Sequence, residues 1–199
     1  SLYTASGINV GIGTSSPSSY LSGTAKLVVY ANANSQHSVL ARNDSSGSSA
    51  SSAFVLNASG NTWGIEMGSS AKNNNALTFQ LDYGGTNATK MTLNSAGNLG
   101  LGVTPSAWSS ASRPALQLPN GAALFSRSGS TFLSQNFFYN SSDTGSYIAN
   151  GFATTYYQEG GNHIWFNSAN NTSGAGATAS LIQAMTLDAS GNLVVGASS

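Results

Sequence analysis

Few side chains in this sequence could take part in acid–base or nucleophilic chemistry. Its 199 residues include six Asp and Glu, two His and no Cys. Glu66 and Glu159 lie in similar strand-like segments, "TWGIEMG" and "TTYYQEGG", and paired carboxylates are the groups that hydrolyse glycosidic bonds. Equivalent positions of tandem units lie one unit apart, so we expect tens of ångströms between these acids, not the roughly 5–10 Å that glycoside hydrolysis requires. The sequence therefore predicts that the protein is not an enzyme.

The two histidines, His37 and His163, stand in no catalytic or metal-binding motif. The sequence has neither Gly-x-Ser-x-Gly nor His-Glu-x-x-His. The glycine-rich stretches "GIGTSS" and "GLGVTP" lack the lysine and the following helix of a phosphate-binding loop. We therefore predict no catalytic residue, no cofactor and no metal site within one chain. A ring of symmetry-related His or Asp on the axis of a trimer is the one metal arrangement left open.

An aromatic cluster is the best candidate for a binding site. The stretch "TTYYQEGGNHIWFN" (154–167) brings together Tyr156, Tyr157, His163, Trp165 and Phe166. In a strand, neighbouring side chains point to opposite faces, so one aromatic of each adjacent pair is expected in the core. The outward ones could stack on sugar rings, which makes Tyr156, Tyr157, His163 and Trp165 candidates for glycan binding. The alternative is that these aromatics fill a core between chains.

The composition indicates a β-rich protein with a surface of amides and hydroxyls. Charged residues make up only 6% of the chain, whereas Ser occurs 36 times, Asn 21 times and Gly 23 times. The six Lys and Arg residues are too few to form a basic surface that would bind nucleic acid or an anionic membrane. No run approaches the roughly 20 apolar residues of a membrane helix. The absence of Cys fits assembly in a reducing compartment such as the host cytoplasm.

Short strand signals recur along the chain, and helix signals are nearly absent. The expected strands are rich in β-branched and aromatic residues and are bounded by Gly, Ser, Asn or Pro. In "ALTFQLD" (76–82) apolar and polar residues alternate, which predicts one inward and one outward face. The expected strands cover residues 26–32, 52–57, 62–67, 76–83, 90–94, 114–119, 122–126, 131–140, 146–150, 154–159, 163–167 and 181–188.

One phrase is written twice, as "MTLNSAGNLGLGV" (91–103) and "MTLDASGNLVVGA" (185–197). The middle of each copy has the residues typical of a tight turn. Gly97 or Gly191 can adopt a positive φ, and the Asn or Asp side chain can hydrogen-bond the backbone of the turn. We predict a β-hairpin whose alternating glycines leave one face bare, so that another chain or sheet can approach. Weaker similarities pair Glu66 with Glu159 and Phe79 with Phe166, which indicates two tandem units.

The residues "INVGIGTSSPSSYLSGTAKLVVYA" and "MTLNSAGNLGLGVTPSAW" resemble a repeat of bacteriophage tail fibres and tailspikes. In that family a Met-x-Leu/Ile-Asp/Asn-x-x-Gly-Asn-Val/Leu-Gly-Ile/Leu-Gly phrase precedes Thr-x-Pro and a Lys-Leu-x-Val strand. The resemblance covers nearly the whole chain and implies a homotrimeric fibre ahead of an endosialidase-type intramolecular chaperone domain that cleaves itself off. No such domain is present here, so Ser199 is expected to be a maturation end or a boundary of the piece. The final copy departs from the pattern at Val194 and Val195.

Together these observations predict an all-β protein with two tandem β-rich repeat units, 1–97 and 98–199, in an elongated homotrimeric fibre. The expected function is a structural virion protein: a segment of a phage tail fibre that helps to bind a host surface glycan. Its expected partners are two further copies of itself, neighbouring virion proteins and host polysaccharide, with no nucleic acid and no membrane insertion. The alternatives are a polysaccharide-degrading tailspike and a head fibre or capsid decoration protein.

Overall fold

The computed structural model describes residues 2–5, 9–12, 27–29, 43–58, 61–82, 88–109 and 114–196. His37, named above, lies outside these residues. The chain divides into two compact units, Ser1–Arg42 and Asn43–Ser199. Within the described residues, no helix is long and apolar enough to cross a membrane.

The first compact unit contains three described strands. They are β1 (Leu2–Ala5), β2 (Asn9–Ile12) and β3 (Leu27–Val29). β1 pairs antiparallel with β2, and β2 pairs parallel with β3, with Val10 opposite Leu27.

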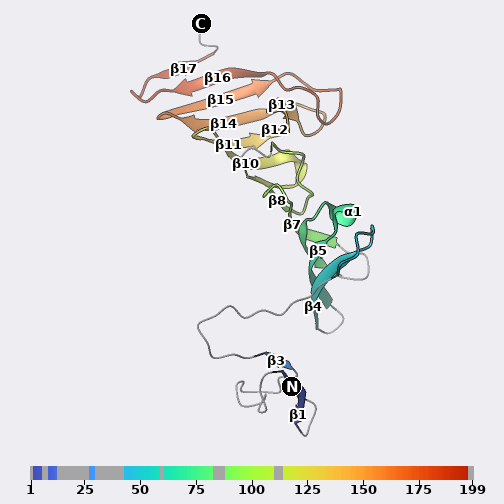
Figure 1. Ribbon diagram of the computed structural model, residues 1–199. Coiled ribbons are helices and arrows are strands. Elements are labelled where there is room, and N and C mark those ends of the chain that lie inside the picture. The colour runs from blue at the N-terminus through green and yellow to red at the C-terminus, as the bar shows by residue number, and fades with distance from the viewer. Residues whose placement is uncertain are drawn as a thin grey trace. The chain divides into compact units, whose positions relative to one another are not determined.

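The second compact unit is built on one twelve-stranded sheet whose strands follow each other in chain order (Figure 1). The sheet strands are β4 (Ser51–Ala58), β5 (Asn61–Gly68), β6 (Leu77–Leu81), β7 (Ala88–Leu93), β8 (Leu99–Leu101), β9 (Ala115–Gln117), β10 (Ala122–Arg127), β11 (Ser130–Gln135), β14 (Thr154–Glu159), β15 (Asn162–Ser168), β16 (Leu181–Leu187) and β17 (Leu193–Val195). A separate hairpin of β12 (Phe137–Tyr139) and β13 (Gly145–Tyr147) lies between β11 and β14 in the chain. Two short helices, α1 (Ser70–Asn73) and η2 (Pro119–Gly121), complete the described elements.

All neighbouring strands of the large sheet run antiparallel except β8 and β9, which are parallel. Leu99 lies opposite Leu116 in that pair, and the same pairing occurs between β2 and β3 with every residue number lower by 89. A parallel pair needs a crossover connection between its two strands, unlike the tight hairpins that join antiparallel neighbours. The two Gly-containing strands, β2 and β8, therefore make the same parallel contact with the Leu-containing strand that follows each of them, one pair in each compact unit.

The all-β character predicted from the sequence is confirmed. Every expected strand segment overlaps a strand, but the expected strand 131–140 is broken into β11 and β12. The break occurs at Asn136, whose φ of 57° no strand can accommodate. The Asn136 side chain holds this corner, because its Oδ1 accepts from the Ala149 amide at 2.7 Å and its Nδ2 donates to the Phe152 carbonyl at 3.1 Å.

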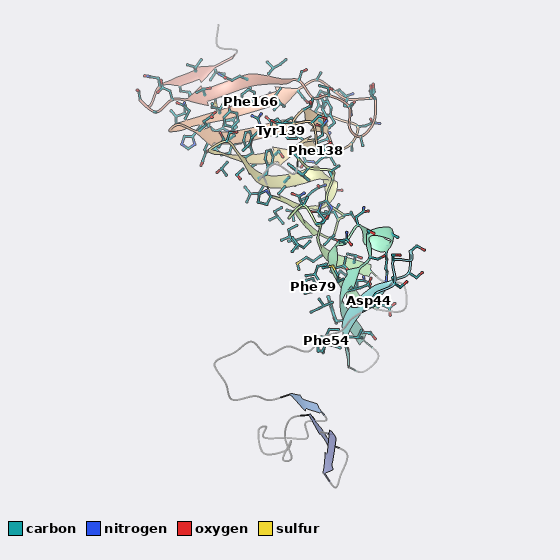
Figure 2. All side chains as sticks on the ribbon, in the orientation of Figure 1. Asp44, Phe54, Phe79, Phe138, Tyr139 and Phe166 are labelled. Carbon is teal, nitrogen blue, oxygen red and sulfur yellow. The ribbon has the colours of Figure 1, made fainter. Side chains whose placement is uncertain are left out.

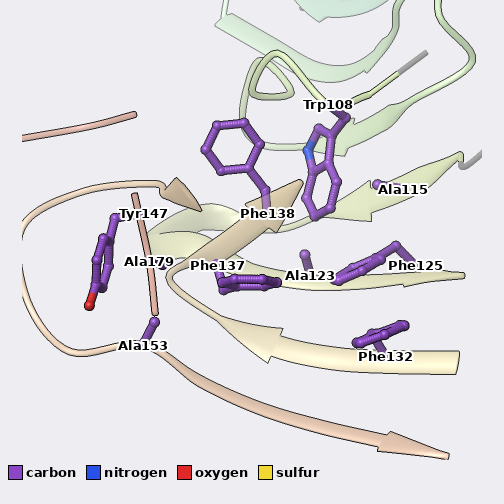
Figure 3. Close-up of a cluster of buried hydrophobic side chains, with 10 residues drawn as sticks. All are labelled: Trp108, Ala115, Ala123, Phe125, Phe132, Phe137, Phe138, Tyr147, Ala153 and Ala179. Atoms are coloured by element: carbon purple, nitrogen blue, oxygen red, sulfur yellow. The ribbon is translucent and has the colours of Figure 1, made fainter. Parts of the chain in front are cut away.

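The apolar core lies between one face of the sheet strands β9, β10, β11 and β14 and the β12–β13 hairpin (Figure 3). Phe125 and Phe132 are cross-strand neighbours whose rings stack at 4.7 Å, and Trp108 packs against Phe125 at 4.9 Å. Phe137 is only 1% exposed. We call the side of the sheet that carries this core the covered face, and the opposite side the open face.

The repeated phrase forms a β-hairpin in both places, as predicted. Asn94 and Asp188 occupy the same turn position, and each side-chain Oδ1 accepts two backbone amides, from residues two and four positions later. Gly97 and Gly191 have φ values of 83° and 85°, which favour glycine. The two turns are therefore alike in backbone, and they differ in the charge of their first residue.

Protonation of Asp188 should weaken the second hairpin only in acid. The side-chain hydrogen bond from Asn192, helped by backbone amides, holds the pKa of the Asp188 carboxyl below its ordinary value of 3.8. Because the folded pKa is depressed, the stabilisation is present above the unfolded pKa and is lost as pH falls through the folded pKa. We expect the Asn192 amide NMR signal to titrate with a midpoint below 3.8. A midpoint at or above that value would contradict this, and the Asn98 amide of the uncharged turn is the control.

Strand registers show which parts of the two hairpin-containing segments correspond. Met91 lies opposite Leu101 and Met185 opposite Val195, and each preceding pair of strands has a bulge next to the aromatic that faces the methionine, Phe79 or Trp165. These registers match Phe79 with Trp165 rather than with Phe166. The sequence similarity that paired Phe79 with Phe166 is therefore one residue away from the match that the strand registers give.

The same registers correct the pairing of the two glutamates. Glu66 lies opposite Thr78 on β6, and the corresponding pair on β14 and β15 is Tyr157 and Ile164. Glu66 therefore corresponds to Tyr157, and Glu159 lies two residues beyond that position.

Candidate interaction surface

The open face of the sheet is the apolar one, and the covered face of β5 to β7 is polar. On β5, Trp63, Ile65 and Met67 are 38–50% exposed, whereas Glu66 between them is 1% exposed. On β6 and β7 the buried residues are likewise Thr78, Gln80 and Thr92. Alternation was predicted correctly, but within one chain the polar set is the covered set. Such a pattern leaves the apolar set available to a partner.

A single cross-strand row of apolar side chains runs along the open face. It passes from β5 to β17 without interruption, because each member lies directly opposite the next in the strand registers. We call this set the apolar row; its members are Met67, Leu77, Leu93, Leu99, Leu116, Leu124, Leu133, Tyr156, Trp165, Met185 and Val195.

None of the eleven side chains in the apolar row is buried, and Leu133 and Val195 are 59% and 75% exposed. Ten strand spacings of about 4.8 Å give the row a length of roughly 50 Å. A neighbouring line on the same face adds Phe54, Ile65 and Phe79, of which Figure 2 labels the two phenylalanines. Contiguous exposed apolar surface of this extent marks an interaction site rather than ordinary surface.

Three of the four proposed glycan-binding residues lie together on the open face. Tyr156 and Trp165 belong to the apolar row, and their rings are 5.1 Å apart. His163 lies beside them, with its Nδ1 2.5 Å from the Tyr156 hydroxyl oxygen, and Gln158 Nε2 donates a hydrogen bond to the same hydroxyl. The structure therefore gathers Tyr156, His163 and Trp165 into one group that continues the apolar row.

Tyr157 is separated from that group. It lies on the covered face, where its ring stacks on Phe166 at 5.3 Å and packs against Phe132 at 4.8 Å. Burial raises the pKa of the Tyr157 hydroxyl, assisted by the negative charge of Glu159. Tyr156 and Trp165 thus lie on the open face, and Tyr157 and Phe166 lie on the covered face, as the alternation along a strand predicted.

The two glutamates lie far apart in the sheet. Glu66 is on β5 and Glu159 ends β14, with six strands between them. Seven strand spacings of about 4.8 Å separate the two strands by roughly 30 Å, several times the distance in a glycosidase. Among the described residues, no three His, Asp or Glu side chains lie close enough together to hold a metal ion.

Comparison with known proteins adds no further assignment. No protein-family model matches the sequence, and no curated protein shows significant similarity to it.

Proposed function

We propose that this chain is a segment of a virion fibre in which three identical copies close their open faces against one another. The single observation that supports this most strongly is the apolar row, which crosses eleven of the twelve strands and has no buried member in one chain. Burying one Leu or Met side chain contributes about 1.5–3 kcal/mol, so a row of this length supplies a large driving force for association.

Identical copies are the partners that suit this row best. It carries no formal charge, so it offers no pattern that would select a charged partner. When copies are related by rotation about an axis along the row, each apolar residue meets its own counterpart at the same height. Closure also removes a long exposed apolar face, which would otherwise promote aggregation. The number three is what the tail-fibre resemblance implies.

The two tandem repeat units belong to the same proposal. The matching hairpins, bulges and parallel pairs support a repeated assembly unit rather than a repeated active site. Each repeat unit would contribute its own part of the apolar row, and the next unit would follow it along the fibre. The neighbouring virion proteins would join at the ends of this segment.

Cysteine cross-linking tests the closure of the open faces. The natural chain has no Cys, so a single substitution introduces one unique thiol. We expect Leu124→Cys, in the apolar row, to form a disulfide-linked pair of chains on mild oxidation. Ser128→Cys, in the turn of the same hairpin, should stay unlinked. Equal linkage of the two variants, or none at Leu124→Cys, would contradict the arrangement.

Location in the virus is tested on intact particles. Gold-labelled antibodies against this chain should decorate tail fibres of the encoding phage and should slow its adsorption to host cells. Decoration of the capsid would instead support a head fibre or decoration protein, and absence from purified particles would refute a virion role. Cleavage of host capsule or O-antigen by the isolated protein would support the alternative of a degrading tailspike.

A further inference from the structure

A polar cavity of about 580 Å³ lies on the covered face of the sheet, opposite the open face. Its floor is formed by the covered side chains of β5, β6 and β7, and its walls by α1, the Asn94 turn and residues 104–107. This volume is within the roughly 300–1,000 Å³ range of small-molecule sites. Because it opens on the other side of the sheet, the cavity does not compete with closure of the apolar row.

The floor of the cavity holds a charged pair and an unused acceptor. Glu66 Oε1 lies 2.6 Å from Lys72 Nζ, so the two charges balance. Gln80 Nε2 donates to Thr78 Oγ1 at 2.8 Å and to Glu66 Oε2 at 3.4 Å. Gln80 Oε1 is buried and accepts no hydrogen bond from the described residues. A buried acceptor without a donor costs about 1–3 kcal/mol, so the cavity is suited to a ligand that donates hydrogen bonds.

The corresponding part of the other segment shows that the fold does not require this polarity. Where the first segment has Glu66 and Gln80, the strand registers place Tyr157 and Phe166 in the second. Those two rings stack, and the cavity they line has a volume of only about 210 Å³. The same sheet can thus be closed with aromatic packing, and the polar cavity is a particular property of β5 to β7.

We propose that this cavity binds a neutral saccharide unit. The paired charges of Glu66 and Lys72 leave no net charge to select an ion. Threonine, asparagine and glutamine groups around the floor offer both donors and acceptors to several hydroxyls. No aromatic ring lines it, so recognition rests on hydrogen bonds rather than stacking. The proposal adds a saccharide site to the proposed fibre. It rests on the glycan binding expected from the sequence, but places the site on the face opposite the Tyr156 group.

Saturation-transfer NMR with the full chain tests the site. The probes are glucose, galactose and N-acetylglucosamine at millimolar concentration, with glucuronate as the charged comparison. We expect transfer to at least one neutral sugar and little to glucuronate. Gln80→Met removes the acceptor at similar volume and should weaken binding about tenfold, as expected for the loss of a polar contact. Ser95→Trp, at the rim, should abolish it.

Ala189→Trp is the matched control, because Ala189 holds the same position in the second turn and lines no described cavity. It should bind sugar as the natural chain does. Absence of transfer from all three neutral sugars in the natural chain, or unchanged binding in Ser95→Trp, would overturn the saccharide site. The sedimentation mass of each variant is recorded alongside, so that failure of the cavity is distinguished from failure of the proposed trimer.

Discussion

Leu133→Asp is expected to convert the assembled protein into separate chains. Leu133 is in the middle of the apolar row and 59% exposed in one chain. In the proposed trimer each copy would bring an ionised carboxylate to the same water-free axis. Removing such a charge from water costs several kcal/mol, so three would cost on the order of 10 kcal/mol per trimer. Sedimentation velocity should therefore show a mass near the 20.2 kDa of one chain.

The control for this prediction is Ser128→Asp, which adds the same charge in the same hairpin. Ser128 is an exposed turn residue with φ of 48°, a conformation that Asp tolerates. It should sediment as the natural chain does. A Leu133→Asp variant that keeps the natural mass would mean that the apolar row is not the assembly surface.

Gly100→Ala should be the most destabilising small change within a single chain. A Cβ at Gly100 would lie 2.0 Å from the carbonyl oxygen of Val103 and 2.9 Å from Pro105 Cδ. The chain after β8 folds back over this bare position, so the obstacle is mainly backbone and cannot rotate away. We expect a loss of about 3 kcal/mol in the free energy of unfolding, measured by urea denaturation at fixed protein concentration.

The second copy of the phrase provides the comparison for Gly100. Val194 holds the corresponding position on β17 and is 46% exposed, with no described segment folded over it. Val194→Ala should therefore shift the unfolding midpoint much less than Gly100→Ala does. Equal effects at the two positions would show that close approach of the 103–105 backbone is not the reason for glycine.

Local sequence patterns predicted the strands well because each strand is short, bounded by turn residues and paired with its neighbour along the chain. The repeated turn followed from Asn94, Asp188 and their glycines, whose requirements are local. The role of Gly100 was only partly predicted. A bare position was expected to admit another chain, whereas the segment that approaches it belongs to the same chain.

The patterns could not predict which face of the sheet is covered. Alternation fixes two faces, but coverage depends on where loops such as 104–107 and the β12–β13 hairpin fold. The polar cavity was missed for the same reason, although Ser69 and Asn74 around "SAKN" are cap signals that could have located α1 above it. The break at Asn136 was also missed, since its left-handed backbone depends on hydrogen bonds to residues thirteen and sixteen positions later.

The mass of the natural chain in dilute solution tests the central claim most directly. Sedimentation equilibrium should give three times the 20.2 kDa of one chain over a wide concentration range, because an uncovered apolar row is unfavourable in water. A single species with the mass of one chain, folded by circular dichroism, would contradict closure of the open faces.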